Sequence, residues 1–280
     1  FIDFLGMLRS KFLKRSTRPT FQSVILAGVY DIKKLKHRIR EDHEHQMNSP
    51  WNIAADFSVD MSFTRDDIAT DSVDGEMLND NIGYIRVTGF NTTSDNGEKS
   101  TFSEFKDKIT ELQSSGMSKM IVDLRDNPGG VLDEACNMAD MILPEGIITY
   151  TETKSGKRTD YNSNAESLDI PIVILINENS ASASEVFTGA LKDYGKATVV
   201  GKKSYGKGIV QSVLPFYDGS GMSLTVAKYY TPNGTCIHGI GIEPDVEVDM
   251  PDEYKDMYAS MVEHDKDTQL QKAIEIIKEK

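Results

Sequence analysis

The chain has 280 residues, of which 39% are hydrophobic, enough to fill the core of one large domain or two small ones. No apolar run reaches the roughly 18 to 20 residues of a membrane-spanning helix, and FIDFLGMLRSKFLKR lacks the charge order of a signal peptide. A net charge of −13 argues against polyanion partners, and Cys136 and Cys236 lack the spacing of a zinc site or a disulfide framework.

The first part of the chain differs from the rest in charge. Residues 1–40 hold ten Lys and Arg residues but only two Asp and Glu residues, although the whole chain is acidic, which suggests a boundary. We expect a helix over residues 1–15, a strand over 21–29 and then a basic stretch, DIKKLKHRIR. This stretch is interpreted as a solvated helix face, because no aromatic residues are interleaved as in a nucleic-acid-binding arm.

Two stretches before residue 64, TFQSVILAGVYDIKKLKHRIR and NSPWNIAADFSVDMSF, resemble an inner fragment of AAA-ATPase-like proteins. No phosphate-binding loop precedes them, so residues 1–63 are not expected to bind ATP by themselves. His43 and His45 lack a third ligand at a suitable spacing, and we expect no metal there.

From residue 75 the pattern changes to alternating strands and helices. Strands are expected over 82–87, 119–124, 170–176 and 197–201, and helices over 101–116, 131–143, 181–195 and 267–280. Hairpins are expected over 146–163 and 208–232. This order predicts an α/β fold with a mixed sheet.

Three loops follow buried strands, where open α/β sheets usually place their chemistry. In DLRDNPGG, two glycines permit a tight turn whose N–H groups can bind an anion, although an ordinary turn would look the same. In SASASE, Ser180, Ser182 and Ser184 alternate at the start of a helix. One of them either caps the helix or acts as a nucleophile beside the helix dipole.

The third loop, GKKSYGKGIVQ, places Lys207 between two glycines, with Gln211 four residues later. An uncharged lysine can act as a base for a serine, and a surface lysine is the alternative. Residues 201–207 also fit the first seven positions of a P-loop. Gly208 stands where that motif needs Ser or Thr, and a strand follows instead of a helix, so nucleotide binding is not expected.

Five ordered motifs over residues 64–280 resemble the C-terminal processing, or tail-specific, serine peptidases: DLRDNPGG, NENSASASEVFTGALKDYGKATVVG, SYGKGIVQ, LTVAKYYTPNG and GIGIEPDVEV. The resemblance implies a crotonase-like protease core without metal, ATP or any other cofactor, which cleaves proteins or peptides near their C-termini. It assigns Ser182 as nucleophile, Lys207 as general base and Gln211 as an assisting residue. It also implies an oxyanion hole formed by the N–H groups of Ala183 and Gly129. His238 is then a loop or rim residue.

The domain arrangement departs from this family. We expect an ATPase-like appendage over 1–63, a peptidase core over 64–250 and a helical tail over 251–280, without the PDZ domain and membrane anchor typical of the family. The family's usual place is outside the cytoplasm, yet no export signal is expected here. The alternative function is a peptidase-like binding or scaffold protein whose activity is impaired because the PDZ domain is absent.

Overall fold

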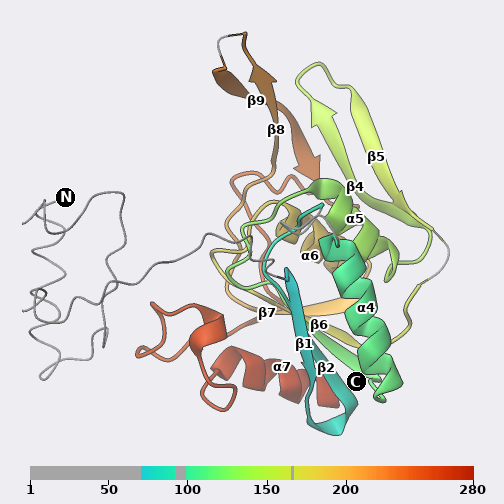
Figure 1. Ribbon diagram of the computed structural model, residues 1–280, viewed down its shortest axis with the longest axis vertical. Helices are drawn as coiled ribbons and strands as arrows, with labels where there is room; N and C mark the ends of the chain where they lie inside the picture. Colours follow the sequence, from blue (N-terminus) through green and yellow to red (C-terminus); the bar gives the residue numbers. More distant parts are fainter. Residues whose placement is uncertain (1–70, 93–98, 165–166, 218) are drawn as a thin grey trace, which may run out of the picture. The chain divides into compact units, whose positions relative to one another are not determined.

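The computed structural model describes residues 71–92, 99–164, 167–217 and 219–280 (Figure 1). These residues belong to one compact unit. The expectations for residues 1–63, including the His43 and His45 pair, lie outside the described residues.

A mixed six-stranded sheet forms the centre of this unit, with the strand order β1-β2-β3-β6-β7-β10. β1 runs antiparallel to β2, and all other neighbours are parallel. Its strands are β1 (Val73–Met77), β2 (Ile82–Val87), β3 (Lys119–Asp123), β6 (Ile172–Ile176), β7 (Ala197–Gly201) and β10 (Val246–Glu247). The buried strands are rich in Ile and Val, as strands covered on both faces usually are.

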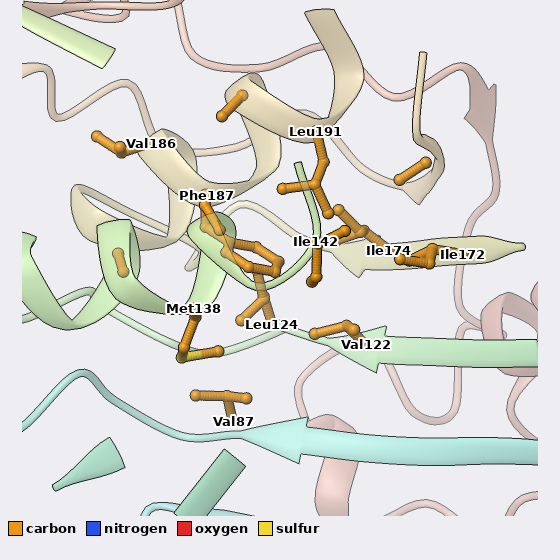
Figure 2. Packing of buried hydrophobic residues seen from close by; sticks show 14 of the residues in the cluster. Val87, Val122, Leu124, Met138, Ile142, Ile172, Ile174, Val186, Phe187 and Leu191 are labelled. Carbon is orange, nitrogen blue, oxygen red and sulfur yellow. The ribbon is translucent and has the colours of Figure 1, made fainter. Parts of the chain in front are cut away.

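Helices cover both faces of this sheet, so the fold is α/β, as predicted (Figure 1). The first face packs against α4 (Thr101–Ser114), α5 (Leu132–Asp140) and α6 (Ala183–Asp193), and the second against α7 (Thr268–Lys278). Because side chains alternate along a strand, Ile172 and Ile174 enter the first core and Val173 and Leu175 the second. Figure 2 shows the first core, where Phe187 of α6 lies among side chains of α5 and the strands.

Helix boundaries follow local capping chemistry. The Ser100 hydroxyl accepts a hydrogen bond from the Ser103 N–H (3.3 Å) at the start of α4, and Gly116, at φ 95°, follows its end. At the start of α7, the Asp267 carboxylate accepts from the Leu270 N–H (3.0 Å). Within the described residues, no helix is both long and apolar enough to cross a bilayer.

A second, antiparallel sheet has the order β5-β4-β9-β8. It consists of β4 (Gly146–Thr153), β5 (Arg158–Ser163), β8 (Ile209–Pro215) and β9 (Gly221–Tyr230), which form the two expected hairpins. The β8–β9 hairpin extends away from the helices (Figure 1). Its apolar side chains Val213, Leu214, Met222 and Leu224 are exposed.

The predicted elements after residue 75 all occur, with ends shifted by a few residues. The elements absent from the sequence analysis are short: β1, β10 and the 3-10 turns η1 (Asn79–Asn81) and η2 (Ala259–Met261). The expected tail after residue 250 contains α7, whose Leu270, Ala273 and Ile277 fill the second core.

Candidate active site

The three loops singled out from the sequence follow β3, β6 and β7, which are neighbours in the central sheet. Parallel strands lie about 4.8 Å apart, and their carboxyl ends share one edge of the sheet. Three loops therefore meet there, although they are far apart in the sequence. They are the glycine loop (residues 124–130), the serine turn (residues 177–182) and the lysine loop (residues 202–208).

The alternating serines have different environments. Ser180 is fully buried, and its hydroxyl donates to the Leu124 carbonyl (2.7 Å). Ser184 is also fully buried, and its hydroxyl donates to the Asn127 carbonyl (3.0 Å). The half-buried Ser182 hydroxyl donates a hydrogen bond to none of the described residues. Two serines thus fix the turn, and the middle one remains available for chemistry.

Ser182 has a strained backbone, with φ 57° and ψ −114°. Positive φ is uncommon for residues other than glycine and costs about 1–3 kcal/mol, so the surrounding structure must impose it. α6 begins at the next residue, and the Ala183 N–H has no acceptor among the described residues. A negative charge that forms beside Ser182 would meet this free N–H and the positive end of the helix dipole.

Gly129 packs directly against this turn. A Cβ atom at Gly129 would lie 2.6 Å from the Ala181 carbonyl oxygen and 2.8 Å from Ser182 Cβ. Gly129 also has φ 97°, which favours glycine. The close approach of the two loops therefore depends on the absence of a side chain here.

The N–H groups of this loop differ in availability. The Gly129 N–H donates to Asn127 Oδ1 (2.9 Å), and the Val131 N–H donates to the Phe90 carbonyl (2.7 Å). The Gly130 N–H has no acceptor in the described part of the chain. The Gly129 carbonyl accepts from the Phe90 N–H (3.1 Å), so the trans peptide turns the Gly130 N–H away from Phe90. Gly130 is exposed, whereas Gly129 is buried.

Glu185, 1% exposed, connects the serine turn to the lysine loop. Its Oε2 accepts from the backbone N–H groups of both Ser182 and Lys207, each at 2.8 Å. Its Oε1 accepts from the Ser204 hydroxyl (2.6 Å) and the Gly206 N–H (2.7 Å). Because the two backbone nitrogens are bonded to the same oxygen at equal distances, the separation between the Ser182 and Lys207 nitrogens is at most about twice that distance.

Lys207 is half-buried, and its Nζ forms no hydrogen bond or ion pair with the residues that the structure describes. No hydrogen bond joins its Nζ to the Ser182 hydroxyl. Gln211 lies on β8 opposite Thr225, is exposed, and is not hydrogen-bonded to Lys207. The structure thus brings together Ser182, Ala183, Gly129 and the Lys207 backbone, and it leaves Gln211 on the hairpin.

The other candidate chemistries lack a matching geometry. His238 is exposed in a loop, and the described residues contain no cluster of His, Cys, Asp and Glu suited to a metal. Residues 209–215 after the P-loop-like run form β8, where a phosphate-binding loop requires a helix.

A buried network of charged side chains supports the glycine loop from the second face of the central sheet, where α7 packs. The Arg125 guanidinium contacts Asp123 Oδ2 (2.7 Å) and Asp267 Oδ2 (2.8 Å), and all three side chains are at most 1% exposed. Burial opposes ionisation of Asp123. The pKa of Asp123 is nevertheless below its usual range, because the charges of Arg125 and Arg86 and the hydrogen bond from the Tyr84 hydroxyl outweigh the effect of burial. Burial, followed by the charge of Asp123, raises the pKa of Tyr84.

Asp126, also at positive φ (61°), joins three segments. Its Oδ1 accepts from the Asn177 (2.8 Å) and Asn179 (3.0 Å) amides, and its Oδ2 accepts from the Ala259 N–H (2.9 Å). A single side chain of the glycine loop is therefore hydrogen-bonded to both the serine turn and the C-terminal segment.

Glu185, Asn127 and Asp126 are site residues to which the sequence alone assigned no role. A signal for Glu185 was present, because Ser182 and Glu185 have the S-x-x-E spacing of a capping box. The links of Asn127 and Asp126 run between loops that are distant in the sequence, and no local pattern predicts them.

Comparison with known proteins gives a consistent picture. The model of peptidase family S41 matches residues 81–248. A probable CtpA-like serine protease of Staphylococcus aureus (strain N315) is 43% identical over 197 residues, which are 69% of this chain and 38% of the relative. Its counterpart in Staphylococcus epidermidis (strain RP62A) is 42% identical over the same shares. This chain therefore matches well under half the length of these relatives.

Two solved structures have a similar fold. The photosystem II D1 C-terminal processing protease has a TM-score of 0.58 and 32% identity, over 67% of this chain and 52% of that chain. A putative S41 protease from Bacteroides fragilis has a TM-score of 0.61 over 74% of this chain and 57% of that chain. At 19% identity, the latter shows the fold alone.

Proposed function

The chain belongs to peptidase family S41, and from this membership we propose that it is a serine endopeptidase that cleaves proteins near their C-termini through a dyad of Ser182 and Lys207. The observation that carries the proposal is the position of Glu185, whose Oε2 binds the backbone of both residues. The preference for C-termini rests on the similarity to a protease named for C-terminal processing.

Ser182 is the nucleophile. Its hydroxyl has no acceptor among the described residues, whereas those of Ser180 and Ser184 are buried and donate to carbonyl groups. Its strained backbone displays the side chain at a strand-to-helix turn, as nucleophilic serines of other hydrolases are displayed.

Lys207 is the base, and it must be uncharged when it acts. The Ser182 oxygen forms a bond to the carbonyl carbon of the substrate while its proton moves to Lys207 Nζ, and the carbonyl π electrons move to the oxygen. When the C–N bond breaks, Lys207 returns the proton to the leaving amine, and water then hydrolyses the acyl-enzyme. Gln211 would have to turn toward Lys207 to assist.

The oxyanion would be stabilised by the free Ala183 N–H and by a glycine of the opposite loop. Gly129 was the choice from the sequence, but its N–H is already donated to Asn127. The neighbouring Gly130 is exposed and its N–H has no acceptor within the described ranges, so the geometry favours Gly130 as the second donor. One such donor contributes roughly 100-fold to 1000-fold in turnover.

The dyad is open in this structure, since no hydrogen bond joins Ser182 and Lys207. Catalytic hydrogen bonds are often long without substrate and tighten when it binds. This opening is also the observation that favours the second candidate function, a protein that binds peptides without cleaving them.

Cleavage of labelled casein, an unfolded acceptor protein, tests the proposal. We expect cleavage by the unmodified chain and none by the Ser182→Ala or Lys207→Ala variants. Lys203→Ala is the matched control, because Lys203 lies on the same loop and its side chain pairs with Glu243 at the surface. Mass spectrometry of peptides blocked at either end shows whether cleavage prefers the C-terminus.

Activity that survives both dyad substitutions would reject the mechanism. Binding of the peptides without cleavage, and without labelling of Ser182 by a fluorophosphonate, would favour the binding protein. We also expect no thermal stabilisation by ATP.

A further inference from the structure

Asn127 is fully buried at the centre of the site, and both ends of its side chain are bonded. Its Nδ2 donates to the carbonyl of Val87 (2.8 Å), the last residue of β2. Its Oδ1 accepts from the Gly129 N–H (2.9 Å). The side chain thus spans from the central sheet to the glycine loop.

The backbone carbonyl of Asn127 serves the serine turn. It accepts from the Ala181 N–H (3.0 Å) and from the Ser184 hydroxyl (3.0 Å). These two donors flank Ser182 on either side. Asn127 is therefore a single buried residue whose hydrogen bonds connect the serine turn, the glycine loop and β2.

We propose that Asn127 is a positioning residue that orients the Gly129–Gly130 peptide for oxyanion stabilisation, an inference that rests on the proposed peptidase function. Asn127 holds the Gly129 N–H, while the Phe90 N–H holds the Gly129 carbonyl. With both sides of Gly129 fixed, the Gly130 N–H has one direction, away from Phe90.

The residue type fits this role. The position needs an acceptor facing Gly129 and a donor facing Val87, and an uncharged amide supplies both. Leucine has a similar shape but neither group. An aspartate keeps the acceptor for the Gly129 N–H whether or not its carboxyl is protonated, so Asn127→Asp retains the bond that Asn127→Leu removes.

Without the acceptor, the buried Gly129 N–H would be unpaired, and the glycine, which has wide backbone freedom, would rotate toward another partner. The Gly130 N–H would rotate with it. Because the oxyanion develops only in the transition state, this change lowers kcat and leaves KM nearly unchanged.

Steady-state kinetics on a quenched peptide from the casein digest test the role. We expect kcat to fall about 100-fold in Asn127→Leu, the scale of one lost oxyanion donor, with a smaller loss in Asn127→Asp. The control is Thr149→Val, which removes another buried hydrogen bond, from Thr149 Oγ1 to the Tyr230 carbonyl (2.7 Å), outside the site. It should keep kcat within about threefold.

A second readout distinguishes orientation from general loss of structure. A peptide aldehyde forms a tetrahedral oxyanion adduct with a serine, whereas the matching alcohol cannot. Asn127→Leu should weaken the aldehyde about 100-fold, in line with one lost donor, and leave the affinity for the alcohol unchanged. Equal weakening of both ligands, or an unchanged kcat, would overturn the proposal.

Amide hydrogen exchange tests the geometry without activity, so it separates this inference from the proposed function. The Gly129 amide should be protected in the unmodified chain and in Asn127→Asp, and should exchange rapidly in Asn127→Leu. Loss of protection throughout the central sheet would mean that the Leu variant is unfolded. The Asp variant would then decide, since unprotected Gly129 in that folded variant contradicts the role.

Discussion

At the scale of single residues, the site depends on hydrogen bonds that leave selected groups free. The Ser180 and Ser184 hydroxyls donate to carbonyl groups, whereas the Ser182 hydroxyl has no acceptor among the described residues. Glu185 uses both oxygens to hold the serine turn and the lysine loop together. Ser182 and Lys207 could be proposed from their motifs. The choice between Gly129 and Gly130 could not, because it depends on which N–H already has an acceptor.

The Glu185→Gln substitution keeps the size of the side chain but removes the charge and one of the two acceptor oxygens. Hydrogen bonds to a charged group contribute about 1.5–3 kcal/mol each, so we expect a loss of at least about 2 kcal/mol in the free energy of unfolding. The Ser182 and Lys207 loops would separate, and kcat would fall at least tenfold. Urea unfolding and casein cleavage measure the two effects. The exposed Glu178→Gln is the control. Equal activity of both variants would contradict the role of Glu185 in holding the serine turn and the lysine loop together.

Cys136 gives a second residue-scale prediction. Burial, followed by the charge of Asp133, raises the pKa of its thiol to about 12. The thiolate is the reactive form, so iodoacetamide at pH 8 should leave Cys136 unmodified in the folded chain and modify it in urea. Mass spectrometry of the digested protein locates the adduct. Rapid modification of Cys136 without denaturant would show that the α5 core is open.

At the scale of elements, α7 packs on the second face of the central sheet, and hydrogen bonds of Asp267 fix its start. Asp267 caps the helix and also pairs with Arg125, which stands two residues before Asn127. The periodicity of residues 267–280 predicted the helix. It could not predict the ion pair, because Arg125 lies 142 positions earlier in the sequence.

Replacing Asp267 by alanine leaves the buried Arg125 with one carboxylate fewer and removes the helix cap. Breaking a buried ion pair typically costs about 3–5 kcal/mol, and we expect a loss of this size in urea unfolding. Asp265→Ala, at an exposed position before the helix, should change stability by less than about 0.5 kcal/mol. A small loss in Asp267→Ala would mean that α7 contributes little to the unit.

At the scale of the whole molecule, stability should depend on acid through Asp123. Its pKa in the folded protein lies below the usual value of about 3.9, so its stabilising contribution is complete above about pH 4. It is lost as the pH falls through the folded value, because protonation removes the charge that Arg125 binds.

Urea unfolding between pH 3 and 7 checks this dependence. We expect the free energy of unfolding to decline below about pH 4, with a shallower decline in Arg125→Met, which lacks the group that lowers the pKa of Asp123 most and keeps only Arg86 and Tyr84. An equal decline in both proteins would assign the acid sensitivity to other carboxylates.

The fold class and the order of the main elements followed from periodicity and turn residues, because these signals are local. Strand pairing is not local, so the sequence did not reveal that β10 closes the sheet edge beside β7 or that Asp126 binds Ala259. The family resemblance supplied the site residues that spacing alone left ambiguous.

The order of β3, β6 and β7 has a consequence for chain continuity. The glycine loop and the serine turn are placed by neighbouring strands, whereas the β4–β5 hairpin lies between them in sequence and ends in a turn at the exposed Gly156. A protease nick in that turn would separate the two loops covalently but leave both strands paired. The two fragments should therefore stay together on a sizing column.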